Sequence, residues 1–125
     1  MSKLILLVDD DPDARVELAS ALLACGFRVR LSTDREEALV LADLYKDMGL
    51  TIDLAIVDLQ LPGTSGQLLT KELRGKTPSV PVFEVSGPVD KQILSAELRQ
   101  GKSNFISNAI AHHEKIRQFG THHQN

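Results

Sequence analysis

The chain has 125 residues, which is enough for one domain with a hydrophobic core and too few for two. Its composition, 42% apolar and 25% charged, excludes a disordered chain, and a net charge of -3 argues against a nucleic-acid-binding surface. The lone cysteine excludes an internal disulfide, and the N-terminal sequence is neither a signal peptide nor a membrane span, so we expect a cytoplasmic protein.

The first predicted element is a buried strand at residues 4–8, which is continuously apolar. This strand leads directly into three aspartates, Asp9 to Asp11. Pro12 and Asp13 then suit the first turn of a helix, which Gly26 ends. Because neighbouring carboxylates repel one another, a positive charge is expected beside the aspartates.

The remaining apolar runs alternate with helical patterns along the chain. They predict a second helix with an apolar face from Ala38 to Tyr45, strands at residues 27–31, 53–58, 80–86 and 104–107, and helices at 67–74, 89–100 and 109–119. Five strands alternating with five helices predict a parallel sheet, covered by helices on both faces and joined by right-handed crossovers.

Polar side chains follow three of the predicted strands. Asp9 and Asp10 end the first strand, Asp58 ends the third, and Ser86 ends the fourth. The carboxyl ends of parallel strands meet at one edge of a sheet, where ligands bind. Carboxylates at that edge suit Mg²⁺ or Mn²⁺, and an aspartate beside the ion can act as a nucleophile toward a phosphoryl group. A single aspartate here, Asp11 or Asp13, would instead cap the helix that follows the first strand.

Four stretches in this order resemble the receiver domain of two-component response regulators: "LLVDDDPDAR", "IVDLQLPGTSG", "PVFEVSG" and "RQGKSNFIS". The resemblance covers nearly the whole chain. It implies an α/β, flavodoxin-like fold, a doubly wound five-stranded parallel sheet of order 2-1-3-4-5 with five helices. We expect the domain to span residues 1–120 and a disordered tail to follow at 121–125.

The resemblance also implies a role for each matching residue. Asp58 would accept the phosphoryl group. Asp9, Asp10 and Asp58, with the main-chain carbonyl of Gln60, would hold Mg²⁺ or Mn²⁺. Ser86 would donate a hydrogen bond to the phosphoryl group and move when that group arrives.

Two positions near the end of the chain bear on the switch. Phe105 matches an aromatic residue that turns inward on activation, although it would equally serve as core filler. Asn108 and Ala109 stand where the family has a lysine followed by proline, so the usual cation is missing there. Lys102 is expected to point away from the site. Glu84, on the fourth strand, would be buried and therefore needs a partner, a proton or solvent.

The implied activity is phosphoryl acceptance from a histidine kinase or phosphotransfer protein, followed by a changed interaction surface for a downstream protein. At most this includes self-phosphorylation from a phosphodonor and autodephosphorylation, without turnover of a small-molecule substrate.

We expect no nucleic-acid or membrane partner, and the resemblance suggests a homodimer through helix four, strand five and helix five. The alternative is a pseudo-receiver, a binding module that works without phosphorylation. The chain would be either a stand-alone receiver or a domain of a longer protein.

Two other kinds of site are less well supported. Asp9 and Asp11 look like the first motif of haloacid-dehalogenase-type phosphatases, but Asp13 stands where that motif has threonine or valine, and the chain is short for that fold. The four histidines lie in two adjacent pairs that diverge on a surface, so they predict solvated side chains and no metal site: His112, His113, His122 and His123.

Overall fold

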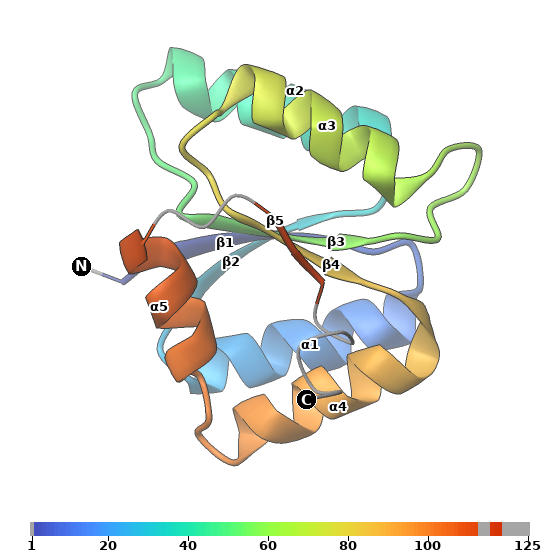
Figure 1. Cartoon of the computed structure of the whole chain (residues 1–125), viewed down its shortest axis with the longest axis vertical. Helices are drawn as coiled ribbons and strands as arrows, with labels where there is room; N and C mark the ends of the chain where they lie inside the picture. Colours follow the sequence, from blue (N-terminus) through green and yellow to red (C-terminus); the bar gives the residue numbers. More distant parts are fainter. Residues whose placement is uncertain (1, 113–115, 119–125) are drawn as a thin grey trace.

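The structure, a computed structural model, describes residues 2–112 and 116–118. A parallel sheet lies between two layers of helices (Figure 1). Neighbouring strands pair in the order β2-β1-β3-β4-β5, and every pair is parallel. The strands are β1 (Leu4–Val8), β2 (Arg28–Ser32), β3 (Leu54–Asp58), β4 (Val82–Val85) and β5 (Ile116–Gln118). The predicted α/β fold class and strand order are therefore confirmed.

Five helices connect the strands: α1 (Pro12–Ala24), α2 (Arg35–Asp47), α3 (Gly66–Lys76), α4 (Gly87–Arg99) and α5 (Asn104–His112). The first three begin with a side-chain cap, which satisfies an otherwise unpaired N–H of the first turn. Asp11 caps α1, Asp34 caps α2 and Ser65 caps α3. The prediction that Asp11 caps a helix is confirmed.

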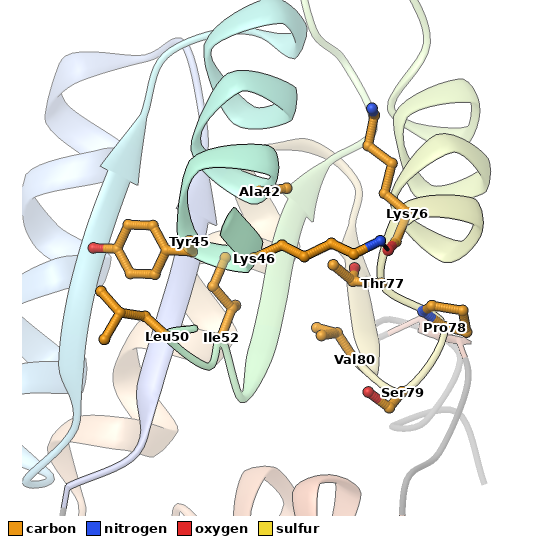
Figure 2. Close-up of a pocket in the computed structure, with 10 residues that line it drawn as sticks. All are labelled: Ala42, Tyr45, Lys46, Leu50, Ile52, Lys76, Thr77, Pro78, Ser79 and Val80. Carbon is orange, nitrogen blue, oxygen red and sulfur yellow. Dashed lines mark hydrogen bonds between the residues drawn. The ribbon is translucent and has the colours of Figure 1, made fainter. Parts of the chain in front are cut away.

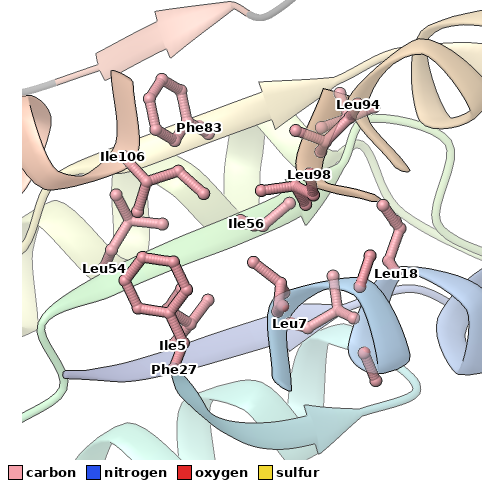
Figure 3. Close-up of a cluster of buried hydrophobic side chains, with 14 of the residues drawn as sticks. Ile5, Leu7, Leu18, Phe27, Leu54, Ile56, Phe83, Leu94, Leu98 and Ile106 are labelled. Carbon is pink, nitrogen blue, oxygen red and sulfur yellow. The ribbon is translucent and has the colours of Figure 1, made fainter. Parts of the chain in front are cut away.

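The hydrophobic core has two parts, one on each face of the sheet. Leu6, Val57 and Val82 face α2 and α3, whereas alternate residues of the same strands face α1, α4 and α5. Figure 3 shows the second part, in which Leu18 of α1, Leu94 of α4 and Ile106 of α5 lie over the sheet. Because β1 and β3 are buried on both faces, β1 and residues 54–57 of β3 are continuously apolar in sequence.

The predicted strand at 104–107 and helix at 109–119 are wrong. Residues Asn104–His112 form α5, and β5 follows at Ile116–Gln118. Ile106 and Ala109 are fully buried, and this spacing of three residues puts them on one helical face. Proline at 109 would break a helix, but the alanine found there continues it. Residues 113–115 and 119–125, including the predicted tail, lie outside the described part of the chain.

The prediction that all crossovers are right-handed is also wrong. The steps from β1 to β2 and from β4 to β5 cross the sheet in opposite directions, yet α1 and α4 cover the same face (Figure 1). The two connections therefore have opposite hands. Contacts between the helices accompany this arrangement: Cys25 Sγ donates to the Leu98 carbonyl at 3.1 Å, and Ser95 Oγ donates to Glu17 Oε1 at 3.3 Å. As a result, α1 and α4 pack together.

The end of the sheet opposite the aspartates carries a pocket of another kind. Figure 2 shows it between the end of α2 and the loop from α3 to β4, with Tyr45, Ile52 and Val80 among its lining residues. Lys46 Nζ donates to the Lys76 carbonyl across it at 3.5 Å. None of the candidate site residues lines this pocket. Within residues 2–112 and 116–118, no helix is long and apolar enough to cross a membrane.

Candidate functional site

Three carboxylates converge at the carboxyl edge of the sheet. Asp58 ends β3, Asp9 and Asp10 follow β1, and the two strands are direct neighbours. One carboxylate oxygen of each residue lies within 4.8 Å of those of the other two. Asp9 and Asp58 are buried, at 1% and 3% exposed, whereas Asp10 reaches solvent. The predicted convergence of the three aspartates is therefore present.

The backbone fixes the orientation of the two buried carboxylates. Asp9 Oδ1 accepts from the Asp11 N–H at 2.9 Å, and Asp58 Oδ1 accepts from the Gln60 N–H at 2.8 Å. Arg15 Nη1 donates to the Asp9 carbonyl at 2.8 Å, which ties α1 to the end of β1. Because each carboxylate has one oxygen bonded to the following turn, its second oxygen is oriented toward the centre of the cluster.

In the structure the positive charge beside the aspartates is Lys91, in the second turn of α4, whereas the sequence predicted a bound divalent cation there. Its Nζ lies 2.9 Å from Asp9 Oδ2 and 2.8 Å from Asp58 Oδ2, and its side chain is only 12% exposed. Sequence reasoning missed Lys91 because right-handed crossovers would place α4 on the opposite face of the sheet. The sequence offered one indication: Lys91 had no predicted role, and it lies near the start of the helix that follows the strand leading to Ser86.

Burial and charge act against each other in this cluster. Burial raises the pKa of the Asp9 carboxyl, and the hydrogen bonds from the Asp11 N–H and from Lys91 only partly oppose it. Burial lowers the pKa of Lys91, but hydrogen bonds to Asp58 and Asp9 outweigh that effect and raise it overall. Lys91 is therefore a charged ammonium group at neutral pH.

The loop after Asp58 depends on a glycine. Gly66 begins α3, and its N–H donates to the Leu59 carbonyl at 3.1 Å. A Cβ at this position would lie 2.3 Å from the Asp58 carbonyl oxygen and 2.5 Å from Leu59 Cα, both of them backbone atoms. Glycine therefore allows α3 to begin directly beside the residue predicted to accept the phosphoryl group.

The other predicted site residues fall into two groups. Ser86 follows Val85, which pairs with Asp58, and it is the exposed N-cap residue of α4, with no side-chain capping bond. Phe105 and Asn108 lie instead on α5, beside the end of the sheet where β1 begins (Figure 1). Phe105 packs edge-to-face against Phe83, with the ring centroids 5.7 Å apart, and Asn108 is exposed. The structure thus brings Ser86 to the carboxyl edge of the sheet, and places Phe105 and Asn108 at the other end.

Glu84 is buried in the middle of β4, at 5% exposed. It pairs in register with Val57 and alternates with Val82, so its side chain is on the face covered by α2 and α3. Lys91 and α4 lie on the other face, which separates Glu84 from the contacts that α4 makes.

Comparison with known proteins identifies the family to which this site belongs. The model of the response regulator receiver domain matches residues 5–118, so the chain belongs to that family. The chain is 33% identical over 119 residues to the transcriptional regulatory protein CssR of Bacillus subtilis, covering 93% of this chain and 49% of CssR. It is 30% identical over 106 residues to a cyclic di-GMP phosphodiesterase of Thermotoga maritima, covering 85% of this chain and 27% of that protein. The chain thus spans half or less of these two relatives.

Solved structures agree on the fold. A CheY-like receiver domain protein from Methanospirillum hungatei superposes with a TM-score of 0.71 at 18% identity, covering 90% of this chain and 97% of that one. The response regulator TrrA from Thermotoga maritima, in complex with Mg²⁺-BeF, gives a TM-score of 0.62 at 25% identity, covering 93% and 84%. These likenesses support the receiver-domain fold of this chain.

The donor set at the carboxyl edge fits a hard divalent cation. Carboxylate and carbonyl oxygens are the ligands that Mg²⁺ selects, and it is commonly held by few carboxylates together with water. The ammonium group of Lys91 already lies between Asp9 and Asp58, which shows that a compact cation fits between these two carboxylates. Asp9, Asp10 and Asp58 are thus the residues that would hold the ion.

Proposed function

We propose that this chain is a phosphoryl-accepting receiver in which Asp58 is phosphorylated, with Mg²⁺ or Mn²⁺ held by Asp9, Asp10, Asp58 and the Gln60 carbonyl. The observation that carries the proposal is the position of Asp58. Its carboxylate is buried at the end of β3, one oxygen accepts from the Gln60 N–H, and the other faces two further carboxylates and an ammonium group. A nucleophile held this way is oriented before its substrate arrives.

The reaction is the transfer of a phosphoryl group to Asp58. A carboxylate oxygen attacks phosphorus, and a new O–P bond forms as the P–N bond of a phosphohistidine breaks. The imidazole of the histidine kinase or phosphotransfer protein leaves with the bonding electron pair and takes a proton from solvent. A divalent cation held by Asp9, Asp10 and Asp58 would supply positive charge to the transferring phosphoryl oxygens. Hydrolysis of the acyl phosphate by water then returns Asp58 to its free carboxylate.

Ser86 has the role of a hydrogen-bond donor to the bound phosphoryl group. It is exposed, it directly follows the residue that pairs with Asp58, and no capping bond holds its hydroxyl group. Its movement would displace the start of α4, where Gly87 adopts a positive φ of 79°. A downstream protein or a second copy of this chain would then bind the changed surface around α4, in the cytoplasm.

Intact-mass measurement after incubation with Mg²⁺ and acetyl phosphate tests the proposal. We expect a phosphoryl adduct on the native chain and none on Asp58→Asn. An adduct that persists in Asp58→Asn but is lost in Asp9→Asn would instead support the phosphatase-like alternative. The absence of any adduct on a folded native chain would contradict the proposal.

A pseudo-receiver is the second candidate, and one observation favours it. Lys91 already pairs with Asp9 and Asp58, so the acidic cluster is partly neutralised without a metal ion. A binding module of this kind would show no adduct and no Mg²⁺-dependent change in its thermal unfolding at millimolar concentration. The same samples therefore separate the two functions.

A further inference from the structure

Lys91 is a functional candidate that the family pattern does not supply. It comes from a helix, whereas the lysine of that pattern ends strand five, where this chain has Asn108. In the structure Asn108 lies on α5, at the far end of the sheet (Figure 1). Lys91 is the lysine whose ammonium group reaches Asp9 and Asp58 within the described residues.

We propose that Lys91 pairs with the phosphoryl group on Asp58 and thereby couples phosphorylation directly to α4. This inference rests on the proposed function, because it requires Asp58 to be phosphorylated. It assigns to α4 a role that the family pattern assigns to strand five.

The geometry at Asp58 supports the pairing. Asp58 Oδ1 accepts from the Gln60 N–H, while Oδ2 accepts from Lys91 Nζ at 2.8 Å. A phosphoryl group on the Oδ2 side would put its oxygens beside an ammonium group that has three donors. Lys91 Nζ also contacts Asp9 at 2.9 and 3.1 Å, so it can exchange a carboxylate oxygen for a phosphoryl oxygen without leaving the site.

Charge gives Lys91 a larger role after phosphorylation than before it. The transferred group adds negative charge to a cluster that already contains three carboxylates. Lys91 is 12% exposed, so water screens its interactions weakly, and the attraction to new negative charge is strong. The ammonium group of Lys91 is then attracted more strongly to the phosphoryl oxygens than to the Asp9 carboxylate.

The attachment of Lys91 to α4 turns this change of partner into movement of a helix. The two halves of α4 are held differently: Leu94 and Leu98, each 1% exposed, anchor the C-terminal half in the core shared with α1, whereas Val89 near the start of the helix is 65% exposed. Few buried apolar contacts therefore hold the first turn of α4 in place. A stronger bond at Lys91 can therefore reposition the N-terminal half of α4.

Phosphorylation of three lysine variants tests the pairing. At saturating Mg²⁺ and with acetyl phosphate as donor, we expect Lys91→Gln to slow phosphoryl uptake roughly a hundredfold, the effect of removing one donor aimed at developing charge. Lys91→Arg keeps the charge and is expected to retain much of the rate. Lys102→Gln removes an exposed lysine from the loop after α4 and is the matched control, expected to behave as the native chain.

Hydrogen exchange provides a readout that a purely structural role would not change. Beryllofluoride with Mg²⁺ is expected to alter the protection of α4 amides in the native chain and in Lys102→Gln, but not in Lys91→Gln, with circular dichroism confirming that each variant is folded. Lys91→Gln with native uptake and a native α4 response would overturn the inference and leave the proposed function intact. No adduct on the native chain would contradict the proposed function and this inference together.

Discussion

Two clusters in which a cation pairs with carboxylates lie at different places in this fold. At the carboxyl edge of the sheet, Lys91 is bonded to Asp9 and Asp58 at 2.9 and 2.8 Å. On the other face, Arg35 of α2 makes a two-pronged pair with Glu72 of α3, at 2.6 and 2.5 Å. The distances alone would rank the second cluster as the stronger.

Exposure to solvent reverses that ranking. The side chains at the carboxyl edge are 2 to 12% exposed, whereas Arg35 and Glu72 are 32% and 27% exposed. Water and salt screen an exposed pair, so its loss has little effect. A buried charge that loses its partner is left without compensation, and the penalty is large. Burial, rather than distance, decides which of the two clusters matters for stability and for function.

The largest effect is expected for Lys91→Met, because it leaves the buried carboxylates of Asp9 and Asp58 without their cation. In the presence of a chelator the free energy of unfolding should fall by about 3 kcal/mol. Millimolar Mg²⁺ should recover most of this loss, since the ion binds the folded state alone. Chemical denaturation with and without Mg²⁺ measures both quantities, and a loss that Mg²⁺ leaves unchanged would contradict binding of the ion by this carboxylate cluster.

Asp9→Asn should instead increase the stability of the fold at neutral pH. Burial raises the pKa of Asp9 in the fold, so between the ordinary value near 3.8 and the raised value the folded state holds a proton that the unfolded state has lost. The contribution of Asp9 to stability therefore falls as pH rises through that interval.

We accordingly expect Asp9→Asn to unfold at a higher temperature than the native chain at pH 7 without metal, with the difference disappearing near pH 3. Lys91 keeps Asp58 as its partner in this variant. Thermal unfolding across this pH range provides the test, and a lower unfolding temperature at pH 7 would show that the Lys91 bond outweighs the burial of Asp9.

Glu72→Gln removes the charge from the partly exposed pair with Arg35 and should have a much smaller effect on stability than Lys91→Met. The bond from Arg35 lowers the pKa of Glu72, so its contribution is present at neutral pH and is lost as pH falls through the lowered value. We expect a slight decrease in the unfolding temperature at low salt and none at high salt. A decrease as large as that of Lys91→Met would contradict the importance given to burial.

Asn108→Lys should have the smallest effect of all. The new lysine would lie on the exposed side of α5, away from the acidic cluster. We therefore expect unchanged Mg²⁺ binding by titration and no recovery of phosphoryl uptake when it is combined with Lys91→Gln. Recovery would mean that position 108 reaches Asp58, contrary to the structure.

The sequence predicted much of the site because its residues follow from strand order. Asp9, Asp10 and Asp58 come after apolar strands, and any parallel sheet that pairs β1 with β3 brings them together. Lys91 could not be found this way, because its position depends on which face α4 covers. The general preference for right-handed crossovers would place α4 on the wrong face of the sheet. In the structure α4 lies on the face that α1 covers, with contacts such as that between Cys25 and Leu98.

The end of the chain shows a second limit of sequence patterns. Residues 104–107 match a strand motif, but Ala109 in place of proline permits a continuous helix, and Ile106 is then buried on one face of it. Short apolar runs do not distinguish a strand from a helix, so only the packing of α5 decided between them.

The most direct test of this account is nitrogen NMR of the lysine side chains, with Lys91→Arg used to assign the signal of Lys91. Because its ammonium group is bonded to two buried carboxylates, it should give a slowly exchanging signal distinct from those of exposed lysines. Addition of Mg²⁺ and beryllofluoride should shift that signal while it stays in slow exchange. A Lys91 signal indistinguishable from exposed lysines, before and after addition, would contradict the placement of this cation at Asp58.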